Sequence, residues 1–346
     1  MKIGRKKIGR NNVFVIAEIG VNHNGSLETA KKMVDAAVKA GADAVKTQTF
    51  KAEKIVTASA GKVGYQKETT GQGTQREMLK KLELKNEDLR TLSDYCREKN
   101  VIFLSTPFDC ESVAELQKLG VPAFKIGSGE LTNYFLLEAV AKTGKQVILS
   151  TGMSTLREVA DSVRFLKKNG SGEIALLHCT SSYPTDLKDV NMQAMLELKK
   201  YAKIIGYSDH TLGKTASTCA VCLGASIIEK HFTLDKSMPG PDQRLSANPV
   251  EFKDLGDSVR SVQAILGGRT KRPTQDERKT MKLVRKSIVA SRDIKKGEKI
   301  TRSMLRDSRP GTGISPKDAW KVIGKQAKED IPEGTLILQK MFWQVR

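Results

Sequence analysis

Residues 204–246 read IIGYSDHTLGKTASTCAVCLGASIIEKHFTLDKSMPGPDQRLS. In this stretch two short apolar runs are separated by a helix-like segment, and a histidine stands just past each run. These are His210 and His231, in a chain that has only four histidines. Short strands that are joined by a helix form the repeating unit of a parallel α/β sheet. The stretch therefore predicts an α/β fold in which two imidazoles follow consecutive strands.

The same alternation of short apolar runs and amphipathic segments extends from residue 13 to residue 268. Eight such strand–helix units are typical of a closed (β/α)8 TIM barrel. A doubly wound sheet is the alternative, but it usually has fewer strands and a glycine-rich turn after the first strand, which this chain lacks. The predicted strands are 14–19, 44–47, 102–105, 123–126, 146–150, 174–179, 204–206 and 226–229, and the predicted helices are 27–40, 86–99, 110–119, 134–142, 156–168, 192–201, 215–223 and 249–266.

Two regions depart from this pattern. The connection over residues 50–85 is long for a barrel and predicts a lid or a binding loop. After the barrel domain (1–268), the polar and basic stretch 269–285 predicts a linker, and 286–346 predict a small β-rich domain. In that domain, 291–305 and 328–342 resemble each other, and each predicts two strands around a tight glycine turn, with a short helix expected in SPKDAWKVIG at 315–324.

Composition limits the class of protein. The net charge of +20 favours anionic partners, but the basic residues are spread along helices and aromatic residues are only 5%, so we expect no nucleic-acid partner. No run is long and apolar enough to predict a membrane span or a signal peptide. Five cysteines, an odd number, predict reduced thiols and a cytoplasmic protein. The Cys219–Cys222 pair lies in a segment that reads as a buried helix, so we expect packing rather than redox chemistry.

Every predicted strand ends in polar residues, although every strand body is apolar. In a TIM barrel the catalytic groups project from the carboxyl ends of the strands, so these residues should converge on one site. In chain order they are Glu18, Asn22 and His23; Lys46 and Gln48; Thr106 and Phe108; Lys125, Ser128 and Glu130; Ser150 and Thr151; Thr180, Ser181 and Tyr183; Ser208, Asp209 and His210; and His231, with Asp242 beyond it.

These residue types indicate a chemistry. Lysines together with hydroxyls and glycine amides bind phosphate or carboxylate groups. Two imidazoles and a nearby carboxylate, with coordination positions left open, form a catalytic site for a divalent metal. The sequence therefore predicts a phosphorylated or carboxylated substrate that lies next to a divalent metal.

Eight motifs in this order resemble the sialic acid synthase family: EIGVNHNG (18–25), VKTQTF (45–50), STPF (105–108), KIGSGE (125–130), STGM (150–153), GYSDHT (206–211), EKHFTLD (229–235) and MPGPD (238–242). The tail, with RPGTGISP at 309–316, resembles the antifreeze-like (SAF) domain that ends those enzymes. The resemblance covers nearly the whole chain. It implies a TIM barrel followed by a SAF domain.

The resemblance also implies a reaction. Members of the family condense phosphoenolpyruvate with an N-acylated amino sugar in an aldol-type transfer that cleaves a C–O bond and releases phosphate. They need a divalent metal, typically manganese, with magnesium and cobalt as alternatives. The leading hypothesis is an N-acetylneuraminate synthase that uses N-acetylmannosamine. Its nearest alternative is a legionaminic or pseudaminic acid synthase that uses a 2,4-diacetamido-6-deoxy hexose, and a non-catalytic carbohydrate-binding protein is an alternative of another class.

The family pattern implies roles for individual residues. His210 and His231 would bind the metal, and Glu18, Glu130 and Asp242 would be catalytic, with Glu18 and Asp242 also near the sugar. Arg309 would reach the sugar of the partner subunit, which implies a domain-swapped homodimer. The phosphoenolpyruvate site would comprise Lys46, Thr106, Lys125, Ser128, Ser150, Ser181 and Ser208, and the sugar site Gln48, Phe108, Tyr183 and Arg309.

Overall fold

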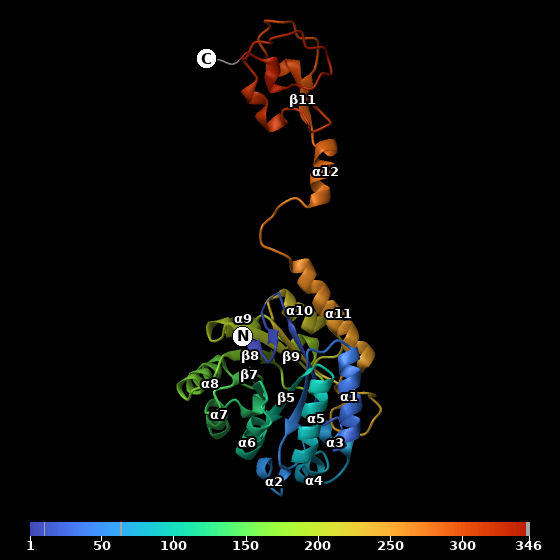
Figure 1. Cartoon of the computed structure of the whole chain (residues 1–346), viewed down its shortest axis with the longest axis vertical. Coiled ribbons are helices and arrows are strands. Elements are labelled where there is room, and N and C mark those ends of the chain that lie inside the picture. Colours follow the sequence, from blue (N-terminus) through green and yellow to red (C-terminus); the bar gives the residue numbers. More distant parts are fainter. Residues whose placement is uncertain (10, 63, 344–346) are drawn as a thin grey trace. The chain divides into compact units, whose positions relative to one another are not determined.

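The computed structural model describes every residue of the chain except 10, 63 and 344–346, and the side chain of Tyr65. The chain divides into two compact units, Met1–Gly267 and Gly268–Arg346. Figure 1 shows both units in the colours of the sequence.

The first unit is a barrel of parallel strands, as predicted. Its eight-stranded sheet has the order β5-β4-β3-β10-β9-β8-β7-β6. The Cα atoms of β5 and β6 approach within 8 Å, so the sheet curls back on itself. The strands are β3 (Phe14–Gly20), β4 (Ala44–Thr49), β5 (Ile102–Pro107), β6 (Ala123–Ile126), β7 (Gln146–Ser150), β8 (Ile174–Cys179), β9 (Ile204–Asp209) and β10 (Ile227–His231).

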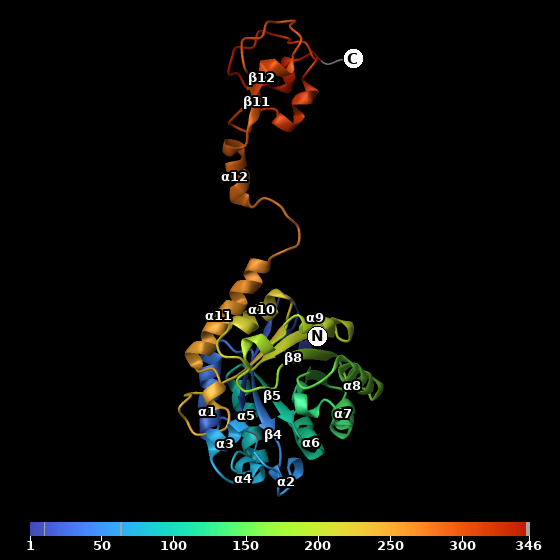
Figure 2. The ribbon, with the colours of Figure 1, turned by 180° about the vertical axis from the view of Figure 1, so that it is seen from behind.

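Helices surround the strands, and both views of the chain show them outside the barrel (Figure 1; Figure 2). They are α1 (Leu27–Lys39), α5 (Asn86–Glu98), α6 (Cys110–Lys118), α7 (Tyr134–Ala141), α8 (Leu156–Lys168), α9 (Ala194–Glu197), α10 (Thr215–Cys222) and α11 (Pro249–Leu266). Capping residues define several starts. Thr155 and Asn248 both form capping boxes, in which side chain and backbone satisfy each other's free donors. The helix predicted over 192–201 is shorter than expected and ends in a 3-10 turn, Leu198–Lys200.

Alternate residues of each strand face opposite sides, and this divides the core into two layers. One set packs against the helices, whereas the other fills the barrel interior. At the amino ends of the strands the interior is apolar, with Phe14, Ile16 and Leu104 among its members. Ile3 and Ile8, which flank the short hairpin of β1 (Lys2–Ile3) and β2 (Lys6–Lys7), pack against the same cluster. This hairpin therefore covers the apolar end of the barrel.

Five of the eight strands extend further at their carboxyl ends than predicted, whereas β6, β7 and β8 end at the predicted residues. β4 continues to Thr49, β9 to Asp209 and β10 to His231. The polar residues at these ends are part of the ladder: Lys46 pairs with Glu18, and Glu18 pairs with His231. For these five strands the prediction is too short, because polar residues line the upper part of the barrel interior and do not mark the end of the strand.

Residues 50–85, predicted as a long loop, contain three short helices: α2 (Ala52–Ile55), α3 (Gly64–Thr70) and α4 (Gln75–Lys80). A small apolar cluster of Val21, Phe50, Met78 and Leu82 anchors this insertion to the barrel. The Nζ atom of Lys62 donates to carbonyl oxygens of residues 70–72 at the end of α3. The insertion is therefore a structured segment, and its role as a lid stays a prediction.

The second unit begins with α12 (Gln275–Val284), which lies inside the stretch predicted as a linker. β11 (Ser287–Ala290) and β12 (Leu305–Ser308) pair antiparallel. Gly297 and Gly334 have positive φ angles of 83° and 79°, so both predicted glycine turns form. The strands predicted around each turn are wrong as separate hairpins. The two repeats bridge each other instead, for example at Ile294–Ile331. The helix expected in 315–324 is a 3-10 helix, Pro316–Lys321.

All five cysteines are free thiols. The prediction that Cys219 and Cys222 are packing residues is wrong, since both are exposed on α10. This helix instead buries a face of small side chains, Ala216, Ser217, Ala220 and Val221. Among the described residues, no helix is long and apolar enough to cross a membrane.

Candidate active site

A cavity of about 680 Å³ opens at the carboxyl ends of the barrel strands. Most of the predicted site residues line it, although they come from eight different strands and the loops that follow them. They are Glu18, Lys46, Gln48, Thr106, Phe108, Lys125, Ser128, Ser150, Ser181, Tyr183, Ser208, His210 and His231.

The other polar residues predicted at the strand ends, Asn22, His23, Thr151, Thr180 and Asp209, do not line the cavity. Three residues to which the family pattern gives a role do not line it either. Asp242 is buried behind His231, with its Oδ2 atom 3.8 Å from the Nδ1 atom of that imidazole. Glu130 is half-buried, and its Oε2 atom accepts a hydrogen bond from Asn133. Arg309 belongs to the second unit, where its Nε atom donates to the carbonyl of Val284. The roles of Glu130 and Arg309 stay predictions.

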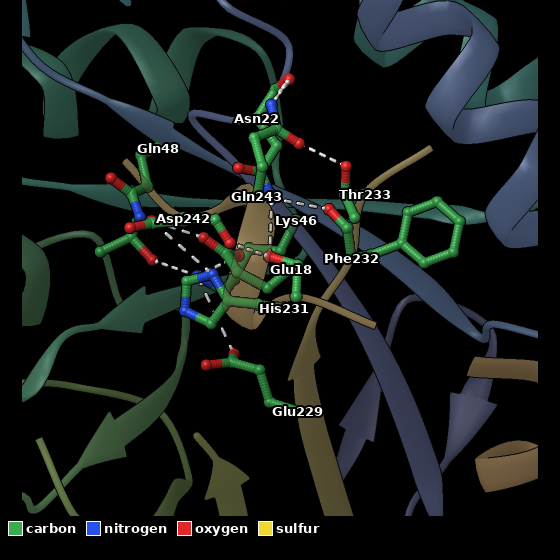
Figure 3. Close-up of polar contacts among 12 residues, drawn as sticks. Glu18, Asn22, Lys46, Gln48, Glu229, His231, Phe232, Thr233, Asp242 and Gln243 are labelled. Carbon is green, nitrogen blue, oxygen red and sulfur yellow. Dashed lines mark hydrogen bonds and ion pairs between the residues drawn. The ribbon is translucent and has the colours of Figure 1, made fainter. Parts of the chain in front are cut away.

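Asn22, which was expected at the end of the first strand, has a structural contact instead. Its side-chain amide donates to the carbonyl of Phe232 and to the hydroxyl of Ser246. The backbone carbonyl of Asn22 accepts a hydrogen bond from the side chain of Gln243, the residue after Asp242 (Figure 3). These bonds fasten the loop that carries Asp242 to the end of β3.

Buried charges of alternating sign form the floor of the cavity. The Nζ atom of Lys46 lies 2.5 Å from Glu18 and 3.9 Å from Glu229, and the Nζ atom of Lys125 lies 3.2 Å from Glu229. Lys46 also donates to the hydroxyl of Thr106, and the hydroxyl of Ser208 donates to Glu229. Figure 3 shows Glu18, Lys46 and Glu229 grouped around the ring of His231. Both lysines therefore have fixed positions before any substrate binds.

The two carboxylates of this network differ in protonation. Burial raises the pKa of Glu18 to about 7, against the opposing charge of Lys46 and with the help of the negative charge on Glu229. Burial also acts on Glu229, but there the charges of Lys125 and Lys46 prevail and lower its pKa to about 2. Near neutral pH the floor therefore holds one carboxylate that is always charged and one that exchanges a proton.

The two imidazoles face each other across one side of the cavity, with ring centroids 5.4 Å apart. The Nδ1 atom of His210 lies 2.8 Å from the carbonyl oxygen of Thr180, which can only accept, so this nitrogen carries a proton, and in the neutral ring Nε2 keeps its lone pair. Burial opposes protonation of His210, but the neighbouring Cys179 and the Thr180 carbonyl outweigh it and raise the pKa of this imidazole. Burial lowers the pKa of His231 well below its ordinary value, so this ring is neutral. Its Nδ1 atom is buried and has no hydrogen-bond partner among the described residues.

These properties fit a divalent metal, since neutral imidazole with a free lone pair is the form that binds one. No group of three or more His, Cys, Asp or Glu residues in the described part of the chain has a metal-binding arrangement. The carboxylate predicted as a third metal ligand is therefore not in place. The residues therefore fit a metal that two histidines hold, with its other positions open toward the cavity.

An ion pair on the outer face of the barrel fixes the two histidines. Asp209 and Lys230 pair directly across β9 and β10, and their charged atoms are 3.0 Å apart with side chains 0% and 3% exposed. Asp209 also accepts hydrogen bonds from Thr211 and Ser217. Because these two residues precede His210 and His231, the ion pair sets the spacing of the imidazoles.

Several lining residues escape the sequence reasoning. Glu229 and Cys179 lie inside strands, and Gln66 and Gln75 lie in the insertion. A signal for Glu229 exists, since it is two residues before His231 and so faces the same side of the strand. Gly152 is also required. A Cβ atom at this position would lie 2.4 Å from the Ser181 hydroxyl, and its N–H donates to Ser128.

Comparisons with known proteins agree with this geometry. The model of the NeuB family matches residues 33–271, and the model of the SAF domain matches residues 285–342. The chain belongs to the NeuB family and carries a SAF domain, which confirms the family predicted from the motifs.

The relatives include synthases of several nonulosonic acids. An N,N'-diacetyllegionaminic acid synthase of Campylobacter jejuni is 46% identical over 328 residues, which are 94% of this chain and 98% of the relative. A pseudaminic acid synthase from the same strain is 35% identical over 350 residues, with 99% and 100% covered. The crystal structure of an N-acetylneuraminic acid synthetase from Leptospira borgpetersenii matches with a TM-score of 0.72 and 36% identity, over 81% of this chain and 94% of that one.

Glu18 generates a prediction about stability and pH. The unfolded chain releases the Glu18 proton near its ordinary pKa of 4.5, whereas the folded chain keeps it up to about pH 7. The folded state therefore loses stability as the pH rises from 4.5 to 7. We expect Glu18→Gln to remove a loss on the order of 1–3 kcal/mol over this range. Thermal unfolding of both proteins at pH 5, 6 and 7 measures it, and parallel pH curves would show that Glu18 does not carry the raised pKa.

Proposed function

We propose that the chain is a nonulosonate synthase, which condenses phosphoenolpyruvate with an N-acylated amino sugar and releases phosphate. One observation carries the proposal. Two buried lysines, surrounded by hydroxyls, share a cavity with two imidazoles at the mouth of the barrel. Family membership supports it, because the relatives named above are synthases of nonulosonic acids.

The lysine side of the cavity would bind phosphoenolpyruvate. Lys46 and Lys125 would neutralise its phosphate and carboxylate groups, and the low dielectric of a buried site strengthens such contacts. The hydroxyls of Thr106, Ser128, Ser150, Ser181 and Ser208 would donate the remaining hydrogen bonds. These lysines are already ion-paired, so binding would exchange partners without any need to order flexible side chains.

The histidine side would bind the acceptor aldehyde. His210 and His231 would hold a divalent metal, with manganese as the first choice, and such a metal polarises a carbonyl oxygen. Gln48, Phe108 and Tyr183 also line the cavity and would contact the sugar. Tyr183 stacks its ring 4.1 Å from that of His210, so the sugar and the metal site would adjoin.

Proton transfers would fall to the carboxyl groups. In the reaction, C3 of phosphoenolpyruvate forms a bond to the carbonyl carbon, whose oxygen takes up a proton. Glu18 would supply that proton, since its raised pKa keeps it partly protonated near neutral pH. Water then adds to C2, and cleavage of the C–O bond at C2 releases phosphate. Glu130 would take the proton of this water, and Asp242, whose pKa burial raises to about 6, would adjoin the acceptor.

We further propose that the acceptor is a 2,4-diacetamido-6-deoxy hexose and the product a legionaminic acid. The support is the higher identity to the legionaminic acid synthase than to the pseudaminic acid and N-acetylneuraminic acid enzymes. N-acetylmannosamine is the second candidate acceptor. A pure carbohydrate-binding role would not need buried lysines and imidazoles in the same cavity.

The acceptor can be identified by phosphate release from phosphoenolpyruvate in the presence of manganese. We expect turnover with a 2,4-diacetamido-6-deoxy hexose at a kcat/KM at least tenfold above that with N-acetylmannosamine, and a nonulosonic acid as product by mass spectrometry. A preference for N-acetylmannosamine would reverse the acceptor assignment and leave the reaction intact. Binding of either sugar without phosphate release would contradict the synthase proposal.

The metal site can be tested by binding alone. We expect His231→Ala to weaken Mn²⁺ binding by tenfold or more, because one of two imidazole ligands is lost. Electron paramagnetic resonance of free Mn²⁺ measures this affinity without any turnover. His178→Ala is a matched control, since His178 donates to the carbonyl of Val190 and does not line the cavity. Equal affinities of both variants would place the metal elsewhere.

We also propose a cytoplasmic, domain-swapped homodimer in which Arg309 of one chain reaches the sugar bound by the other. The support is the family resemblance of the tail and, for the compartment, the free cysteines. We expect Arg309→Ala to raise the KM for the acceptor at least fivefold and to leave that for phosphoenolpyruvate within twofold. Steady-state kinetics and light scattering test both parts. A monomer in solution, or an unchanged acceptor KM, would contradict this arrangement.

A further inference from the structure

Glu229 is a buried carboxylate for which the proposed reaction has no use. It is 4% exposed and faces the cavity from the middle of β10. Ile227 lies two residues below it in the apolar part of the barrel, and His231 lies two residues above it. Figure 3 shows its carboxylate directed toward the group of Lys46 and Glu18.

This carboxylate contacts three groups at once. Its Oε1 atom lies 3.2 Å from the Nζ atom of Lys125 and accepts a 2.9 Å hydrogen bond from the hydroxyl of Ser208. Its Oε2 atom lies 3.9 Å from the Nζ atom of Lys46. The contact with Ser208 is fixed by the backbone, because the two residues are partners in the β9–β10 ladder.

In the proposed function, Lys46, Lys125 and Ser208 all bind phosphoenolpyruvate. Two buried ammonium groups repel each other strongly at short range, and a shared carboxylate between them offsets that repulsion. Glu18 does not do the same, since it pairs with Lys46 alone of the two lysines and its Oε1 atom accepts a hydrogen bond from the side chain of Gln48. Glu229 is the carboxylate that bridges both lysines in the described structure.

We infer that Glu229 is a positioning residue for phosphoenolpyruvate, which holds Lys46, Lys125 and Ser208 in the arrangement that receives the phosphate and carboxylate groups. It acts through these three groups, since a carboxylate has no favourable contact with an anionic substrate. The inference rests on the proposed function, because it takes the lysines to be the anion-binding groups.

Charge and position predict opposite results for Glu229→Gln. The variant loses one negative charge near the site, so electrostatics alone would tighten the binding of an anion. Positioning predicts the reverse, since an amide cannot pair with two ammonium groups and the lysines lose their fixed places. We expect the affinity for phosphoenolpyruvate to fall by tenfold or more, with Mn²⁺ affinity changed less than twofold.

A double-mutant cycle with Lys125→Met separates positioning from general damage to the barrel. If Glu229 acts through Lys125, the loss caused by Glu229→Gln is smaller when Lys125 is already absent. Asp43→Asn is a matched control. Asp43 is a carboxylate with 9% side-chain exposure that pairs with Lys6 and Arg260, just before β4 begins at the opposite end of the barrel. This control should lower the melting temperature and leave the affinity for phosphoenolpyruvate unchanged.

The experiment is calorimetric titration of phosphoenolpyruvate into the full-length, metal-free wild type and each variant, with Mn²⁺ binding measured separately. Glu229→Asp keeps the charge but shortens the side chain, so it tests the same contact if Glu229→Gln does not fold, and we expect a loss of at least threefold. Tighter or unchanged binding in the folded variants, or additive effects in the cycle, would overturn the positioning role. A wild type that binds no phosphoenolpyruvate would overturn the proposed function, and this inference with it.

Discussion

The alternation of charge along Glu18, Lys46, Glu229 and Lys125 is the constraint on which the site depends. An isolated charge in the interior of a protein costs far more than a domain's net stability, so these four groups can be buried only as a neutralised set. Their neutralisation needs a particular register of β10, β3 and β4, in which Glu18 stands opposite both Lys46 and His231. A slip of one residue would turn every inward group outward. The chemistry of the site and the register of the barrel are therefore specified together.

The sequence reveals the scaffold and the polar strand ends, but not how they connect. Eight strand–helix units suffice for the barrel, and the run of polar ends suffices for most of the cavity. Glu229 escapes because the predicted strand, 226–229, ends at this residue, although the strand continues to His231. Gln66 and Gln75 escape for a different reason. Their helices reach the cavity only because the insertion packs on Val21 and Phe50, and no local pattern encodes that contact. In the tail, the strand pattern is the same whether a repeat pairs with itself or with the other repeat.

The two faces of β9 and β10 have different roles: the outward face stabilises the barrel, and the inward face contributes to the cavity. Outward-facing Asp209 and Lys230 form a buried ion pair, whereas inward-facing His231 keeps a buried nitrogen that has no hydrogen-bond partner in the part of the chain that the structure describes. An unsatisfied buried polar atom costs stability, so it persists where the surrounding structure holds it in place. The ion pair of Asp209 and Lys230 holds His231 in place, because it joins β9 to β10 one residue before each histidine. The rigid outer face thus allows the inner face to keep a nitrogen without a hydrogen bond, and such an atom is available to a ligand.

The same division separates the two substrates of the proposed reaction. The groups assigned to phosphoenolpyruvate lie mainly on strands or directly after them, where the register of the barrel leaves little freedom. Of the groups assigned to the acceptor, Gln48 lies on β4, whereas Phe108, Tyr183 and Asp242 lie in the segments that follow strands, where sequence changes are tolerated without loss of the fold. Synthases of different nonulosonic acids can therefore share the strand ends and differ in these loops. Glu229, buried on a central strand between both lysines, belongs to the part that should not vary, whichever sugar the cavity accepts.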